Sequence, residues 1–289
     1  MSTKAPTLRQ FQDRFPTEES CLDHLMRIRF GERHDCEKCG KEAKFYRVKA
    51  RRSYACEWCG AQVYPTAGTP FDRTRTSLRD WFFVMFQFCS TRSGVAAKEV
   101  ERQIGVTYKT AWRMCHEIRK YMAIVDGDEP LGGFTKQVEV DETIIGGYTD
   151  EGRMSNKTVV IGLMERGGKV MTKVVPNQRR ATLLPVIKEN VKRHSIVHTD
   201  EAGAYLTVGG EGFYHMSVNH SAGQYVGAQG TSVNSIEGFW AQLKRSINGT
   251  HIHVSQKHLP KYLGEFEFRH NRRHRPSTML DELLTSFVR

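Results

Sequence analysis

The sequence lacks any apolar run long enough to cross a membrane, and its first residues, MSTKAPTLRQF, lack the apolar core of a secretion signal. Internal repeats and low-complexity tracts are absent as well. These absences exclude an integral membrane protein and a repetitive architecture. We therefore expect a globular protein of the cytoplasm.

Acidic residues are fewer than basic ones, because 32 Asp and Glu stand against 43 Lys and Arg, a formal net charge of +11. Residues 1–125 hold 23 basic and 14 acidic side chains, whereas residues 126–289 hold 20 and 18. A basic surplus favours a polyanionic partner. With 289 residues the chain can form two or three domains, and the uneven charge indicates a binding region followed by a catalytic one.

Seven cysteines in a reducing compartment favour metal ligation over disulfides. Four of them form two CxxC pairs, Cys36 with Cys39 and Cys56 with Cys59. The 16 residues between the pairs are typical of a zinc ribbon, and Gly40 and Gly60 would release the turn after each pair. A redox-active CxxC is the alternative, but two such pairs favour a structural Zn²⁺. Arg47 and Lys49, between the pairs, favour contact with DNA phosphates.

The segment Thr76–Met122 predicts helices throughout. Within it, Val95–Ile104, a turn at Gly105 and Thr107–Tyr121 resemble a helix-turn-helix. Lys109 and Arg113 would lie early in the second helix, where such motifs usually meet DNA. A helical hairpin with no role in nucleic-acid binding is the alternative, and the zinc ribbon and basic surplus argue against it.

The turn-rich segment Val125–Gly133 is the best boundary within the chain. After it we expect strands at 137–147, 157–166 and 169–176, a helix at 179–193 and a strand at 195–200. The chain thus divides into three predicted regions. They are N-terminal helices with a zinc ribbon (1–70), a helical DNA-binding region (71–125) and a catalytic domain (126–289).

Three acids in this last region come from separate elements: Asp141 in the first strand, Asp200 at the end of the fourth, and Glu237 on a predicted helix, Thr231–Arg245. Carboxylates brought together in this way suit a pair of hard divalent cations. Each acid also has a simpler interpretation. Glu237 could complete a capping box with Asn234, Asp200 could cap a short helix, and Asp141 could lie at an exposed strand edge.

On the predicted helix, Glu237, Trp240 and Lys244 share one side at helical spacing. We expect Trp240 to pack between the helix and the sheet rather than to stack on a base. Glu142 should point away from Asp141, because successive strand residues alternate between faces, whereas Glu139 shares its face and suits a peripheral role.

The C-terminal basic run Arg269–Arg275 contains Arg272 and Arg273, which we expect to face DNA near the acidic site. His220, in the loop before the predicted helix, is a further candidate to approach DNA.

The acids are separated by 58 and 36 residues, and Lys244 follows Glu237 by seven. With its flanking residues, this series resembles the core of the DDE transposases. The specific resemblance is to the bacterial insertion-sequence group with an N-terminal zinc ribbon, the insertion sequence fifteen-ninety-five family with its ISXO-type transposase domain. It covers nearly the whole chain.

The resemblance implies an α/β fold in which a ribonuclease-H-like domain, a mixed sheet with helices, follows the zinc ribbon and the helix-turn-helix-like region. It implies that Asp141, Asp200 and Glu237 bind Mg²⁺ (or Mn²⁺), and that Lys244 contacts phosphate. The implied partner is double-stranded DNA, as transposon ends and target, bound in the nucleoid by a homodimer or higher oligomer. Two alternatives are a transposase-derived regulatory DNA-binding protein without catalysis and a stand-alone ribonuclease-H-like nuclease.

Overall fold

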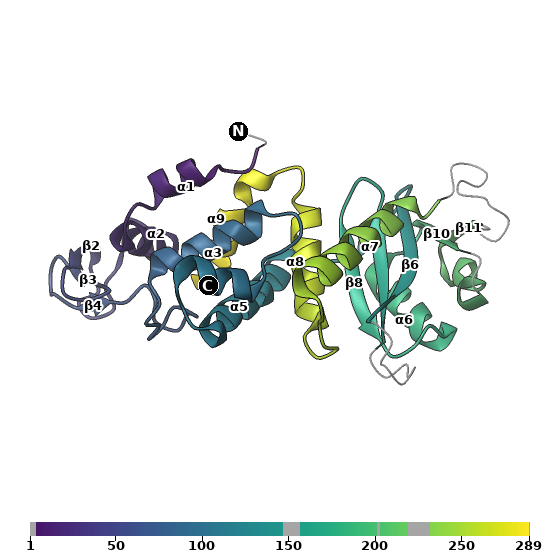
Figure 1. The fold of residues 1–289 in the computed structure, drawn as a ribbon. Coiled ribbons are helices and arrows are strands. Elements are labelled where there is room, and N and C mark those ends of the chain that lie inside the picture. The colour runs from purple at the N-terminus through teal and green to yellow at the C-terminus, as the bar shows by residue number, and fades with distance from the viewer. Residues whose placement is uncertain (1–3, 147–156, 201–202, 219–231, 289) are drawn as a thin grey trace. The chain divides into compact units, whose positions relative to one another are not determined.

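The computed structural model of the protein describes residues 4–146, 157–200, 203–218 and 232–288 (Figure 1). The chain divides into two compact units. The first comprises Met1–Thr91, Val95–Tyr121 and His274–Arg289, and the second comprises Arg92–Gly94 and Met122–Arg273. Within the described ranges, every helix is too short or too polar to cross a lipid bilayer.

The first unit combines helices with a small antiparallel sheet. Its helices are α1 (Leu8–Arg14), α2 (Glu18–Phe30), α3 (Leu78–Ser90), α4 (Ala97–Ile104), most of α5 (Tyr108–Asp126), η7 (Pro276–Thr278) and α9 (Met279–Val288). Its sheet has the order β1-β2-β3-β4 and contains β1 (Arg33–Asp35), β2 (Glu42–Val48), β3 (Ser53–Cys56) and β4 (Gln62–Val63).

The core of the first unit forms where α3 meets α2 and α9. Ser77 caps α3 by accepting a hydrogen bond from the Asp80 N–H at 3.0 Å, and the helix then buries eight apolar side chains. Trp81 of α3 meets Phe287 of α9 edge-on. The sequence placed α9 with residues 126–289, yet its apolar side chains complete this N-terminal core.

The second unit is built on a five-stranded mixed sheet. The strands of this unit are β5 (Leu131–Gly132), β6 (Gln137–Ile145), β7 (Thr158–Glu165), β8 (Val170–Val175), β9 (Val191–Lys192), β10 (Ile196–Asp200) and β11 (Tyr214–Val218), of which β5 and β9 form a separate two-stranded sheet. Its helices are α6 (Arg180–Asn190), α7 (Asn234–Ser246) and α8 (Leu259–Asn271), with the short turns η2 (Gly203–Tyr205), η3 (Val208–Glu211) and η6 (Ile247–His251).

The strand order in the large sheet is β11-β10-β6-β7-β8. β6, β7 and β8 are antiparallel neighbours, whereas β10 runs parallel to both β6 and β11. The predicted order of three strands, a helix and a strand is therefore confirmed. The predicted helix 179–193 ends earlier, at Asn190, because the chain continues into β9 and pairs with β5.

Two apolar cores lie on opposite faces of this sheet. One joins the sheet to α6 through residues such as Val138, Val140 and Leu183, and the other joins it to α7 and α8 through residues such as Val160, Ile236 and Leu263. Figure 1 shows α7 lying along the sheet beside β6. We refer to the side covered by α7 as the α7 face, and the candidate acidic site lies there.

Candidate metal centres

The four ribbon cysteines converge at one point. The Sγ atoms of Cys36 and Cys59 are 3.6 Å apart, those of Cys39 and Cys56 are 3.9 Å apart, and all four atoms lie within 4.8 Å of one another. A tetrahedral zinc ion with Zn–S bonds of about 2.3 Å requires sulfur separations of roughly 3.8 Å. The thiols are free, so the arrangement fits a tetrahedral Zn²⁺.

The two CxxC turns repeat the same backbone geometry. The Gly40 N–H donates to the Cys36 carbonyl at 2.7 Å, and the Gly60 N–H donates to the Cys56 carbonyl at 3.0 Å. Both glycines have positive φ angles, 66° and 69°, which other residues adopt at a cost. The role predicted for the two glycines is confirmed. Backbone N–H groups at the first turn also lower the pKa of Cys36 to about 7, which favours the thiolate that binds metal.

Asp141 and Asp200 lie on neighbouring parallel strands. Val197 and His198 of β10 pair with Val138 and Glu139 of β6. Two residues further along, the same register would place Asp200 beside Asp141, and the Asp200 charge acts on the Asp141 carboxyl group. Val197 packs on the α6 side, so Asp200, three residues later, points to the α7 face.

The Asp141 carboxyl group lies in a strained electrostatic setting. Burial, followed by the charges of Glu142 and Asp200, raises its pKa to about 7. A carboxylate that burial and neighbouring acids both destabilise is well suited to a divalent cation, which would compensate the charge.

Trp240 contacts Asp141 directly. Its indole Nε1–H donates a hydrogen bond to Oδ2 of Asp141 at 3.0 Å, and its ring lies over Gly162 of β7. The predicted packing of Trp240 between helix and sheet is confirmed, but the contact with the acid was not predicted. Its sequence signals are a tryptophan one turn after Glu237 and a glycine inside a strand pattern.

Glu237 and Lys244 lie on the exposed side of α7, whereas Trp240 lies on its buried side, so the prediction that the three share one side of the helix is wrong. The capping-box interpretation of Glu237 is wrong. Asn234 is the first residue of the helix, the N-cap is Val233, and no side chain at the N-cap accepts a hydrogen bond. Residue 231, where the predicted helix began, and His220 lie outside the described residues.

The N-terminus of α7 is instead capped by Glu139 of β6. The fully buried Glu139 carboxylate accepts hydrogen bonds from the N–H groups of Ser235 and Ile236 at 2.9 and 3.0 Å. It also accepts from Arg166 Nε at 2.8 Å, and that guanidinium donates to the Ser232 carbonyl at 2.8 Å. Glu139 thus fixes the helix that carries Glu237 and Trp240 to the strand that carries Asp141.

Among the described residues, the ribbon cysteines alone form a group of three or more metal-ligand side chains with ligand atoms all within 4.8 Å of one another. Asp141, Asp200 and Glu237 do not form such a group: the two aspartates lie on the α7 face of the sheet, and Glu237 lies on the exposed side of α7.

Glu142 points to the opposite side of the sheet, as strand alternation predicts. It accepts hydrogen bonds from the Tyr205 hydroxyl and, at 3.1 Å, from Gln178 Nε2. His198, which lies on the α7 face, contacts Gln137 Oε1 at 3.0 Å, and burial lowers its pKa to about 4. His198 is therefore a neutral structural residue in the network around Arg166.

Of the four predicted DNA-contacting residues, three are exposed and one is buried. Lys109 and Arg113 are exposed on α5, which follows α4 after a turn at Gly105 with a φ of 68°. Arg273 is also exposed, although it donates to the Gly168 carbonyl at 3.0 Å.

The prediction that Arg272 faces DNA is wrong in this structure. Arg272 is 6% exposed, because its guanidinium forms a 2.6 Å ion pair with Asp126 and donates to the Val125 carbonyl. Arg269 is similarly engaged by Glu265. Arg269 and Arg272 are therefore held by acids within the second unit, whereas Arg273, His274 and Arg275 are exposed.

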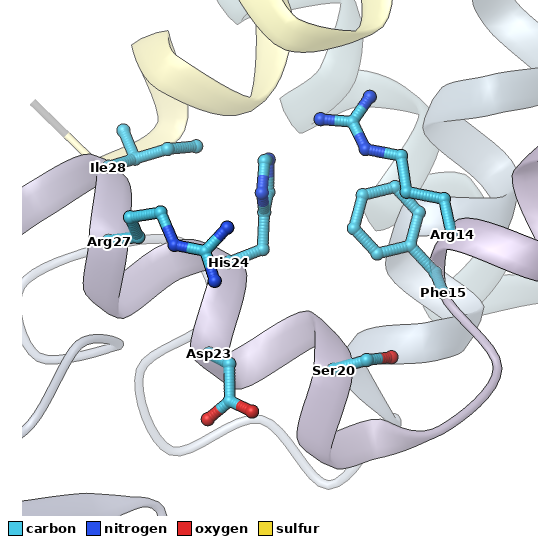
Figure 2. A pocket seen from close by; sticks show the side chains of 7 residues that line it. All are labelled: Arg14, Phe15, Ser20, Asp23, His24, Arg27 and Ile28. Carbon is cyan, nitrogen blue, oxygen red and sulfur yellow. The ribbon is translucent and has the colours of Figure 1, made fainter.

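A surface cavity of about 410 Å³ in the first unit is lined by three basic side chains together with Phe15, Ser20, Asp23 and Ile28 (Figure 2). Arg14, His24 and Arg27 surround it, but Arg14 is paired with Asp281. Burial and the Arg14 charge lower the pKa of His24 to about 4, so His24 is neutral near pH 7. The cavity therefore offers less positive charge than its lining suggests.

Two sequence families match this chain. The ISXO2-like transposase domain matches residues 130–271, which contain the acidic site, and the transposase zinc-ribbon domain matches residues 16–62, which contain the four cysteines.

Two relatives span different parts of the chain. A Haemophilus influenzae protein named an uncharacterized transposase-like protein is 40% identical over 106 residues, which are 36% of this chain and 81% of that protein. A Halobacterium salinarum protein named an uncharacterized protein in transposable element ISH50 is 26% identical over 282 residues, 88% of this chain and 91% of that protein.

Proposed function

The chain belongs to the ISXO2-like transposases, and on that premise we propose that it is an active DDE transposase, which nicks DNA at the ends of an insertion sequence and joins them to a target. The observation that carries the proposal is the arrangement of acids on the α7 face. Asp141 and Asp200 lie side by side on parallel strands, and Glu139 fixes the helix bearing Glu237 to the same strand as Asp141.

The topology supports a ribonuclease-H-like catalytic domain. Three antiparallel strands, a helix and two parallel strands follow one another along the chain, and the helices cover both faces of the mixed sheet. In this arrangement Asp141 lies within the central strand β6 and Asp200 ends its parallel neighbour β10.

Asp141, Asp200 and Glu237 are the residues that would hold two Mg²⁺ (or Mn²⁺) ions. Such ions activate an attacking hydroxyl and stabilise the leaving oxygen of an in-line phosphodiester displacement. The donor set fits them, because it consists of hard carboxylate oxygens and because the raised pKa of Asp141 marks a site deficient in positive charge. Lys244, two turns beyond Glu237 on the exposed side of α7, would contact a phosphate of the bound end.

The first unit supplies the features expected of end recognition. The ribbon fits a structural Zn²⁺ and is flanked by basic side chains, and Lys109 and Arg113 lie exposed at the start of α5 after a tight turn. We assign these two residues to contacts with double-stranded DNA, together with Arg273. Two ends must be held together for strand transfer, so the active species would be a homodimer or a higher oligomer.

Cleavage and joining of a labelled duplex that carries the element's own ends tests the proposal. Wild-type protein should give nicked and joined products only with Mg²⁺ or Mn²⁺, and Asp200→Asn should abolish both while retaining duplex binding. Glu189→Gln, which removes an exposed acid from α6, is the charge-matched control and should behave as wild type. Tight binding without cleavage by the wild type would instead indicate a regulatory DNA-binding protein, and cleavage without joining would indicate a nuclease.

A further inference from the structure

Gly162 creates a space that the Trp240 ring fills. Gly162 of β7 is the residue paired with Asp141 of β6 across the antiparallel ladder. A Cβ atom at position 162 would lie 2.5 Å from Cζ2 of Trp240, well inside the closest distance that real contacts reach. Any larger residue at position 162 would therefore push the indole away from the sheet and from Asp141.

Among the hydrogen bonds between described residues, the indole N–H of Trp240 donates to the carboxylate of Asp141. Trp240 is 4% exposed, and its Nε1–H donates to Asp141 Oδ2 at 3.0 Å. A buried indole N–H without an acceptor is costly, so the bond constrains both partners. Packing alone would be satisfied by phenylalanine, which lacks this donor.

The rotation of α7 is fixed independently of this bond. Glu139 holds the N-terminus of α7 by accepting hydrogen bonds from Ser235 and Ile236, which follow it by 96 and 97 residues in the sequence. Trp240 follows Ile236 by about one turn, so a helix held at its first turn delivers the indole to one place on the sheet. The three residues Asp141, Gly162 and Trp240 therefore form a set, in which the indole N–H holds Oδ2 of the carboxylate.

We propose that Trp240 is a positioning residue, which orients the Asp141 carboxylate for metal binding through its indole N–H, and that Gly162 is required for this contact. The inference rests on the proposed function, because it assigns Asp141 to the metal site. Partners that orient a metal ligand typically contribute about 10–100-fold to metal affinity.

The test is Mn²⁺ binding, measured by electron paramagnetic resonance on the full chain with its zinc retained. Trp240→Phe should weaken Mn²⁺ binding by about 10-fold. Gly162→Ala should weaken it similarly by displacing the ring. Gly238→Ala is the matched control, because a Cβ at this position on α7 meets no atom within 4 Å, and it should bind Mn²⁺ as wild type does.

The hydrogen bond has its own spectroscopic signature. The ¹H–¹⁵N indole signal assigned to Trp240, absent in Trp240→Phe, should shift in Asp141→Asn and on addition of Mg²⁺ to wild type. The other three tryptophan signals should not shift. Trp240→Phe serves only to assign the signal; the shifts themselves are measured in wild type and in Asp141→Asn.

Strand joining by Trp240→Phe should recover toward the wild-type rate at high Mn²⁺, because the ligand remains and only its orientation is lost. If the wild type binds Mn²⁺ and joins DNA while Trp240→Phe matches its Mn²⁺ affinity, the positioning role is overturned and the proposed function stands. A wild type that neither binds Mn²⁺ nor joins DNA overturns both.

Discussion

The zinc ribbon and the proposed acidic metal site are assembled over very different lengths of chain. The four cysteines lie within 24 consecutive residues, on two turns with matching backbone hydrogen bonds. The acidic site needs a strand, a parallel neighbour and a helix capped by a residue 97 positions away. The ribbon can therefore be built locally, whereas the acidic site depends on the whole second unit.

The largest effect is expected from a substitution that disrupts the zinc ribbon and leaves the second unit intact. Cys39→Ser should remove the bound Zn²⁺ and unfold residues 33–64, because structural zinc contributes on the order of 10 kcal/mol to such small folds. The second unit should keep its cooperative unfolding transition, since none of its strands uses the metal. Zinc content by atomic absorption and thermal unfolding by circular dichroism measure the two effects.

Cys89→Ala is the control for this experiment, because Cys89 is a buried cysteine of α3 outside the metal group. It should leave one Zn²⁺ per chain. A Cys39→Ser protein with an intact ribbon would show that the hairpin folds without metal.

The next largest effect is expected from a substitution that removes the contact between α7 and β6 at the acidic site. Glu139→Ala should destabilise the second unit by about 3–5 kcal/mol, because it leaves Arg166 without its carboxylate and α7 without a cap. Urea unfolding of the full chain measures this loss. Glu129→Gln removes an ion pair with Lys169 from a side chain that is 85% exposed, and it should change stability by less than about 0.5 kcal/mol.

Glu139 and Arg272 show where sequence reasoning reaches its limit. Helix and strand periodicity located β6, β10 and α7 to within a few residues, and alternation placed Glu139 on the same face as Asp141. The partners of Glu139 lie 96 and 97 residues away, and the Asp126 that buries Arg272 lies 146 residues away. Neither pairing leaves a pattern in the nearby sequence. A run of charged residues therefore looks the same in the sequence whether it is exposed to solvent or buried by tertiary contacts.

The dependence of stability on pH should report the repulsion between Asp141 and its neighbouring acids. The folded-state pKa of Asp141 is about 7, against an ordinary value of 3.8, so the folded protein keeps a proton that the unfolded chain releases between these values. The Asp141 contribution to stability must therefore fall as pH rises from about 4 to 7. Asp141→Asn removes this loss and should be more stable than metal-free wild type by about 2–4 kcal/mol at pH 7.5.

The difference between wild type and Asp141→Asn isolates this group, since His24 and His198 titrate in both proteins. The gap should close at pH 4, and Mg²⁺ should stabilise wild type at pH 7.5 but not Asp141→Asn. Parallel stability curves across this range would mean that Asp141 is not electrostatically strained.

The smallest effects come from two glycines that serve opposite purposes. Gly60→Ala should destabilise the ribbon by about 1 kcal/mol, because φ is 69° although a Cβ would meet no atom within 4 Å. Gly60→Asn should recover part of this loss, since asparagine tolerates the left-handed region.

Gly162 does not have a positive φ, so asparagine offers no conformational advantage at this position. Gly162→Ala should cost about 1–3 kcal/mol through overpacking against Trp240. Thermal unfolding of the three variants separates a glycine required by local backbone conformation from one required by a distant side chain. Equal losses for Ala and Asn at position 60 would contradict the conformational explanation there.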